Sequence, residues 1–448
     1  MRYTLRWISA FAVGWVYVMS PTALLAAGFD NNQSAYFQGM SNAGLAAGGS
    51  SVSSIFFNPA AGAFAGTGLT YESSYSLIMP RTELTVTNPE QQLPPSGTSE
   101  VDIGRDALTL ASYSTRRLND DWVLGLSLSA PFGLGQEPDD SNWAGKYHGL
   151  SSKFITFNAT PSVSYQLSPK IALGVGMQVE YLRIVNIKSA SPLGLSTLKQ
   201  DEFGTDNFGV GFTAGINFSP TPGTSIGLGY RSSVHHDIEG DINLRFNSDA
   251  ALLGLTGKAK APVKAEIEFP EKITFGIRQE LSPTSRLFGT VMWTDYTSLD
   301  SVSVVAKRPL DGLAPAGAPI ANFDFGWHES WSFALGGEYD LSPSVTLRSG
   351  VAYELSPIRN ATERLIQLPD SDRWWVSAGA SYKWNEKLSL DIAYNHMFYD
   401  DVPFDRTPTS TLLPPVHLVG EADVNLDIVV VGLRWKFGGS PMQLKSLK

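Results

Sequence analysis

Alternation of apolar residues with small or polar residues is the feature that most constrains the fold of this chain. Between residues 171 and 181 every odd position is apolar, while the even positions hold alanine, glycine, glutamine and glutamate. Residues 124–128 and 429–437 repeat this period of two. Such spacing predicts β-strands with one apolar face and one face that tolerates water.

The same pattern recurs along the chain in fourteen segments, and the connections between them alternate strictly between tight turns and long loops. The segments are residues 68–79, 103–116, 121–132, 153–167, 170–185, 206–219, 223–237, 264–281, 285–297, 328–341, 344–355, 371–385, 387–399 and 424–437. An even strand number with short turns at one end and long loops at the other is typical of bacterial outer-membrane barrels. The sequence therefore predicts an all-β fold, a transmembrane 14-stranded antiparallel β-barrel over residues 67–437.

The first residues have the layout of a secretory signal. Arg2 and Arg6 precede an apolar stretch, and small residues follow it. We expect residues 1–26 to be removed on export and residues 438–448 to form a short periplasmic tail. The absence of cysteine excludes a disulfide framework, and the formal charge of -10 disfavours a nucleic-acid partner.

Residues 27–66 lack sustained strand alternation and are dense in glycine, alanine, serine and asparagine. A barrel of fourteen strands encloses a lumen wider than its own side chains fill. We therefore expect this segment to form an N-terminal hatch that plugs the barrel. The alternative is a floppy tail in the periplasm.

Several segments together resemble one family. They are AGFDNNQSAYFQGMSNAG with the later triplet Asn58-Pro59-Ala60, then SAPFGLGQEPDDSNWAGKYHGLSSKFITFNATPSVSYQLSPKIALGVG, LGYRSSVHHDIEGD, FPEKITFGI and LPDSDRWWVSAGASYKW. In this order they resemble the FadL-like family of outer-membrane long-chain fatty-acid and aromatic-hydrocarbon transporters. The resemblance implies a 14-stranded barrel with a hatch, an apolar pocket, and lateral release beside a kinked third strand.

The resemblance also assigns roles to two short segments. Asn58, Pro59 and Ala60 would belong to the hatch, where rearrangement opens the path. The kink would fall at Ala130, Pro131, Phe132 and Gly133, because proline removes a ladder hydrogen bond and glycine loosens the chain. An ordinary strand end is the alternative interpretation of the second segment.

A fatty-acid carboxylate inside the barrel would need a cation, because an unpaired buried charge is costly. Strand parity points Lys188, if its strand continues without a bulge, and Arg373 into the extracellular end of the lumen. Both are therefore candidate carboxylate partners. The alternative for each is a structural ion pair with an inward acid such as Glu180 or Glu354.

Apolar residues of the long loops could form an outer landing site for the ligand. The candidates are Phe132, Leu134, Trp143, Tyr147, Leu193 and Leu195. Aromatic residues at loop bases are also expected simply as an interfacial girdle.

The predicted function is passive, hatch-gated transport of hydrophobic small molecules, with long-chain fatty acids as the first choice and aromatic hydrocarbons or alkanes as the alternative. A general diffusion porin and a structural or adhesive barrel are the competing classes. We expect no enzymatic activity and no cofactor, and a monomer surrounded by the lipid of a Gram-negative outer membrane. No metal site is predicted, because adjacent residues of His235-His236-Asp237 point to opposite faces of a strand and no third ligand is evident.

Overall fold

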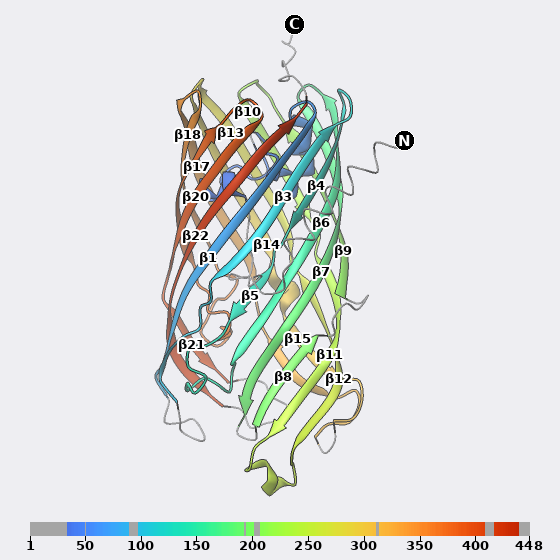
Figure 1. The fold of residues 1–448 in the computed structure, drawn as a ribbon, viewed down its shortest axis with the longest axis vertical. Helices are drawn as coiled ribbons and strands as arrows, with labels where there is room; N and C mark the ends of the chain where they lie inside the picture. Colours follow the sequence, from blue (N-terminus) through green and yellow to red (C-terminus); the bar gives the residue numbers. More distant parts are fainter. Residues whose placement is uncertain are drawn as a thin grey trace.

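The computed structural model describes residues 34–49, 51–88, 97–191, 194–200, 207–310, 313–407 and 416–438. Within them, fourteen strands form one closed antiparallel barrel, seen from the side in Figure 1. The last strand pairs with the first, from Leu69↔Phe437 to Val86↔Gly420, and this pairing closes the wall. The predicted strand number and barrel architecture are confirmed. Closure gives every wall strand a pairing partner on each side, as lipid requires, because lipid offers the backbone no hydrogen-bond partners.

The wall strands follow one another around the barrel in chain order. They are β1 (Leu69–Val86), β3 (Ala107–Arg117), β4 (Trp122–Ser129), β6 (Ser151–Ser168), β7 (Ile171–Ser191), β9 (Phe208–Phe218), β10 (Thr224–Arg231), β13 (Glu271–Ser282), β14 (Ser285–Asp295), β17 (Glu329–Ser342), β18 (Val345–Glu354), β19 (Arg373–Lys383), β20 (Leu388–Tyr399) and β22 (Leu418–Phe437). Most match one predicted segment within a few residues, apart from those that continue into a predicted loop. The predicted segments 223–237 and 264–281 were too long, because β10 ends at Arg231 and β13 begins only at Glu271.

The period of two corresponds to the two faces of the wall. On β7, Val175 and Met177 point outward and are at least half exposed, whereas Ala172 and Gln178 point inward and are buried. In a bilayer the exposed apolar face meets hydrocarbon, so its exposure stabilises the inserted barrel rather than costing solubility.

Further strands lie wholly, or for β11 and β12 partly, in stretches predicted to be loops. They are β2 (Glu100–Asp102), β5 (Gly133–Gln136), β8 (Gly194–Gln200), β11 (Val234–Phe246), β12 (Lys258–Phe269), β15 (Ser301–Ala306), β16 (Pro319–Asp324) and β21 (Val402–Arg406). Figure 1 shows β8, β11, β12 and β15 extending the wall at one end. The outward side chains Asp237, Glu239 and Asp241 of β11 are charged, so the apolar alternation that identifies a membrane strand is lost there.

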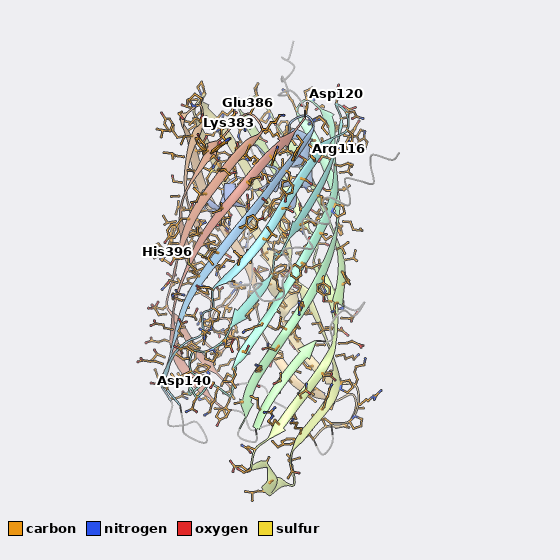
Figure 2. All side chains as sticks on the ribbon, in the orientation of Figure 1. Arg116, Asp120, Asp140, Lys383, Glu386 and His396 are labelled. Atoms are coloured by element: carbon orange, nitrogen blue, oxygen red, sulfur yellow. The ribbon has the colours of Figure 1, made fainter. Side chains whose placement is uncertain are left out.

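The two ends of the barrel differ in their connections. Figure 2 places Arg116, Asp120, Lys383 and Glu386, which lie in or beside tight turns, at one rim and Asp140, from a long connection, near the other. The short and long connections therefore lie at opposite ends, as the sequence predicts.

The N-terminal segment (residues 34–49 and 51–66) lies inside the barrel near the rim of the tight turns (Figure 1). It contains the helix α2 (Ala35–Gln38) and the 3-10 helices η1 (Val52–Phe56) and η2 (Pro59–Phe64). Two further 3-10 helices, η5 (Ala250–Leu253) and η6 (Tyr296–Leu299), lie in long connections. None of the described helices is long and apolar enough to cross a membrane.

Glycines of the wall let the N-terminal segment approach the strands closely. A Cβ atom added to Gly174 of β7 would overlap the backbone of Pro59 and Ala60, and one added to Gly229 of β10 would overlap the carbonyl of Phe57. These inward glycines are therefore required for backbone packing against the wall.

Candidate functional site

The third strand of the wall is interrupted where the chain reads Ala130-Pro131-Phe132. Pairing of β4 with β6 ends at Ser129↔Asn158, and pairing of β5 with β6 resumes one register position out of step, at Gly133↔Ile155. Within the interruption, the amide of Phe132 donates to Oγ1 of Thr156 at 3.0 Å. The change of register bends the strand, and Phe132 points into the barrel and is buried.

The interruption also breaks the strand pairing on its other side. Pairing between β3 and β4 ends at Ser112↔Leu128, and the next bridge across this seam in the described chain is Gly104↔Gln136. Between these two points, residues 107–111 of β3 pair only with β1. We call this stretch without strand pairing the wall gap.

An apolar cavity of about 130 Å³ lies on the inside, beyond the end of the third strand. Its lining comes from β5, β6, β7, β8, β11, β12, β15 and β16 and from Phe325, Leu365, Gln367 and Leu368, and we call it the outer cavity. The lining includes Leu134, Phe154, Leu182, Ile238, Val304 and Leu368. Almost every side chain in it is a hydrocarbon, so the cavity suits an apolar ligand.

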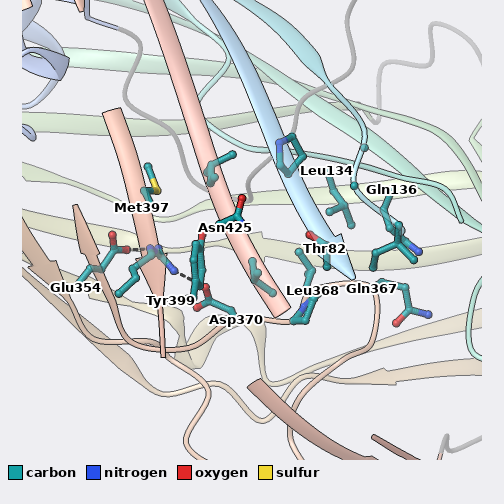
Figure 3. Close-up of a pocket in the computed structure, with 18 of the residues that line it drawn as sticks. Thr82, Leu134, Gln136, Glu354, Gln367, Leu368, Asp370, Met397, Tyr399 and Asn425 are labelled. Atoms are coloured by element: carbon teal, nitrogen blue, oxygen red, sulfur yellow. Dashed lines mark hydrogen bonds and ion pairs between the residues drawn. The ribbon is translucent and has the colours of Figure 1, made fainter. Parts of the chain in front are cut away.

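A second cavity of about 130 Å³, the inner cavity, adjoins the first and shares Leu134, Gln367 and Leu368 with it. Figure 3 shows Glu354, Asp370 and Tyr399 on one side of it and Leu134 and Gln136 on the other. The segment after the interrupted strand, β5, therefore borders both cavities through Leu134 and the inner cavity also through Gln136.

The ionic side of the inner cavity is centred on Arg373. One terminal nitrogen of Arg373 donates to Glu354 Oε1 at 2.6 Å, and the other donates to Asp370 Oδ1. Glu354 is the direct cross-strand neighbour of Arg373 on β18, whereas Asp370 comes from the preceding loop. The guanidinium therefore already has two carboxylate partners.

The N-terminal segment packs beside the inner cavity without lining it. Trp375, Met397 and Ile428 line the cavity and belong to the same apolar cluster as Tyr36 and Met40 of the segment. A ligand passing along the barrel axis would meet this segment next.

The triplet Asn58-Pro59-Ala60 fixes the N-terminal segment to the wall. The Asn58 amide donates to the carbonyls of Ala46 at 2.8 Å and Ile216 at 3.1 Å, and its Oδ1 caps η2 by accepting from the amide of Ala60. The carbonyl of Pro59 accepts from Ser164 of β6 at 2.7 Å. Asn58 is completely buried, so each of these polar groups is satisfied within the protein.

The inward orientation predicted for Lys188 is wrong. The pairing of β6 with β7 shifts between Lys153↔Asn186 and Phe154↔Ile184, which leaves Val185 as an extra residue. A bulge of one residue exchanges the two faces of a strand. Beyond it Ile187, and not Lys188, lines the outer cavity. Arg373, by contrast, points inward as predicted.

The candidate landing residues are separated by the fold. Leu134 lines both cavities, but Trp143 is completely buried in a different core, with Leu84 and Phe404. Neither cavity includes Tyr147 or Leu195 in its described lining, and Leu193 lies outside the described residues. Trp143 is drawn inward because the long connections pack on one another and close a core of their own.

Residues of the long connection after β18 were missed by sequence reasoning. Gln367 and Leu368 line both cavities, and Asp370 binds Arg373. A loop that folds into a lumen carries no periodic signal, so its direction could not be predicted.

One group of side chains has metal-ligating chemistry. His235, Asp237 and Glu266 are exposed, and their ligand atoms lie within 4.8 Å of one another. His236 points to the opposite face, as expected, but β12 supplies a third potential ligand that the sequence did not reveal. This group lies on the outside of the wall, away from both cavities.

Comparison with known proteins identifies the family to which this barrel belongs. Residues 16–437 match the model of the family described as outer membrane protein transport protein (OMPP1/FadL/TodX). This chain belongs to that family. A long-chain fatty acid transport protein of Escherichia coli is 27% identical over 314 residues, which cover 64% of this chain and 68% of the relative.

Solved structures share the fold of this FadL/TodX family member. A Pseudomonas aeruginosa FadL homologue superposes with a TM-score of 0.81 at 21% identity, covering 92% of this chain and 100% of the homologue. The toluene transporter TodX of Pseudomonas putida gives a TM-score of 0.66 at 14% identity, covering 93% and 99%.

Family membership fixes the broad class and location of the protein. It is an outer-membrane transporter of a Gram-negative bacterium, and its family is a family of transporters rather than enzymes. The named relatives carry a fatty acid or toluene, so the family handles hydrophobic small molecules.

Proposed function

We propose that this protein, acting as a single chain in the lipid of the outer membrane, carries hydrophobic small molecules passively from the outer cavity to the inner cavity and releases them through the wall gap. The main support for this route is that the two cavities share part of their lining. Leu134, Gln367 and Leu368 line both. An apolar molecule crossing there remains in contact with hydrocarbon side chains.

The wall gap supports lateral release. Residues 107–111 of β3 lack a pairing partner on the side of β4, and the interrupted strand that borders them supplies lining to the inner cavity through Leu134 and Gln136. A sideways exit lets an apolar ligand avoid water, whereas the axial route is filled by the N-terminal segment.

The N-terminal segment acts in this proposal as the hatch. Asn58 and Pro59 hold it against β6 and β9, and its residues Tyr36 and Met40 belong to the apolar cluster that includes Trp375 and Met397 of the inner cavity. Displacement of the segment would change the packing behind these lining residues, so movement of the hatch would couple ligand entry to release.

The proposal is tested by blocking the passage between the cavities. Leu134→Trp adds bulk where the two linings meet, and uptake of labelled oleate or toluene by cells lacking their own transporter should fall at least tenfold, roughly 1.4 kcal/mol in the barrier. The matched control is Leu335→Trp on the exposed lipid-facing wall, with surface levels compared for both variants. Unchanged uptake by the Leu134 variant would contradict the route.

A further inference from the structure

We propose that His235, Asp237 and Glu266 bind a divalent transition-metal ion of the Zn²⁺ class on the outer face of the wall, and that this ion joins β11 to β12. The three residues supply one imidazole nitrogen and two carboxylate oxygens. The site is independent of the proposed transport route, because it lies on the opposite face of the wall from the outer cavity.

Strand geometry brings the three side chains together. His235 and Asp237 lie two positions apart on β11, so both point to the same face. Glu266 of β12 is the direct cross-strand neighbour of Asp237, and Figure 1 shows the two strands side by side. Nε2 of His235 lies 3.7 Å from Oδ1 of Asp237, and the ligand atoms of all three residues lie within 4.8 Å of one another.

These separations are close to those of a bound metal ion. Metal–ligand distances of about 2.0–2.2 Å put two ligands of a tetrahedral Zn²⁺ roughly 3.4 Å apart. All three side chains are exposed, so they can rotate by the small amount that remains without disturbing packing. An imidazole ligand favours Zn²⁺ and similar ions, whereas Mg²⁺ and Ca²⁺ prefer oxygen ligands. Three protein ligands leave a fourth position for water.

The charges along the outer face of β11 single out this position. The next two outward acids each have a lysine partner, since Glu239 pairs with Lys307 at 2.7 Å and Asp241 pairs with Lys260 at 2.7 Å. Within the described chain, neither acid of the proposed site pairs with a lysine or an arginine, although the two stand directly opposite each other. Like charges in that arrangement repel. A divalent cation between them would replace the repulsion with attraction.

The same stretch of the two strands forms part of the outer cavity on its inner face. Ile238 and Ala265 are cross-strand neighbours that line this cavity, and each follows or precedes a residue of the proposed site. The outward side chains are charged rather than apolar, so this face meets water and not hydrocarbon. An ion can therefore reach the site from solution, and by joining β11 to β12 it would hold this part of the cavity wall together.

The test measures metal binding to the purified full chain, without a polyhistidine tag, by calorimetry in detergent at about pH 7.5, because imidazole binds a metal only when unprotonated. Zn²⁺ should bind at least about tenfold more tightly than Mg²⁺. His235→Asn and Glu266→Gln should each weaken Zn²⁺ binding by about tenfold or more. The matched control Glu239→Gln, at the next outward position after Asp237, should leave it unchanged. Equal affinities for the two ions, or wild-type affinity in the His235 variant, would overturn the proposal.

Hydrogen exchange locates the bound ion. At a free Zn²⁺ concentration of about ten times its Kd, local opening of the β11–β12 pair should fall about tenfold, and the amides of both strands should exchange more slowly by that factor. Amides of β19 should not respond, and the His235→Asn variant should lose the effect. Zn²⁺ binding that leaves exchange in β11 and β12 unaltered would place the ion elsewhere and refute the assignment.

Discussion

Arg231 on β10 connects the N-terminal segment to the wall, and its replacement should loosen that segment without unfolding the barrel. The side chain is buried and donates to the carbonyl of Phe56 at 2.7 Å. Its guanidinium carbon lies 3.8 Å from the centre of the Phe56 ring, and it also bonds Gln178 of β7. Arg231 therefore contacts η1 and two strands together.

The free energy that Arg231 contributes to docking of the N-terminal segment follows from its two contacts with Phe56. A hydrogen bond from a charged donor contributes about 1.5–3 kcal/mol, and a desolvated cation–π contact about 0.5–2 kcal/mol. Arg231→Met keeps much of the aliphatic volume and removes both contacts, so we expect a loss of about 3 kcal/mol from docking of the segment. Since about 1.4 kcal/mol is tenfold, local opening should rise roughly 100-fold.

Hydrogen exchange followed by mass spectrometry measures this opening directly. Exchange of the amides in η1 should accelerate by about two orders of magnitude, while amides in the middle of β13 stay protected. The control Arg183→Met replaces an arginine on β7 that lines neither cavity. Equal protection of η1 in the Arg231 variant and the wild type would refute the reasoning.

Three further predictions concern the wall and the outer loops. Gly229→Ala should lower the temperature of heat-modifiable unfolding, because its Cβ would overlap the carbonyl of Phe57, whereas Gly337→Ala, where a Cβ has ordinary contacts, should not. Trp143→Ala should cost about 3–5 kcal/mol of packing in the outer core, seen as faster trypsin cleavage in residues 137–150 with an unchanged barrel. Burial lowers the pKa of His148 in the outer loop to about 4 from 6.5. The unfolded loop therefore takes up a proton first, and loop stability present above about pH 6.5 should fall as pH drops toward 4, by at most about 3 kcal/mol. Tryptophan fluorescence measured against pH would follow this loss of loop stability. His148→Gln should remove the pH dependence.

The face of the wall to which a strand residue points could be predicted from the sequence, because side chains of a strand alternate between only two faces. Arg373 and Glu354 were both assigned to the lumen, and they are cross-strand neighbours in the structure. The predicted inward orientation of Lys188 was wrong, because a single extra residue at Val185 reverses the two faces of the strand beyond it. A bulge depends on the pairing partner, and the strand's own sequence does not encode it.

The amino-acid sequence by itself determined the strand count and the alternation of short and long connections. Each of these depends on local composition or on a period of two. Only the tertiary structure decided that Gln367, Leu368 and Asp370 complete the cavities, that Trp143 closes a separate core, and that Asp370 joins Glu354 in pairing with Arg373. Those facts depend on how loops distant in sequence pack together, and packing between distant segments leaves no repeating signal along the chain.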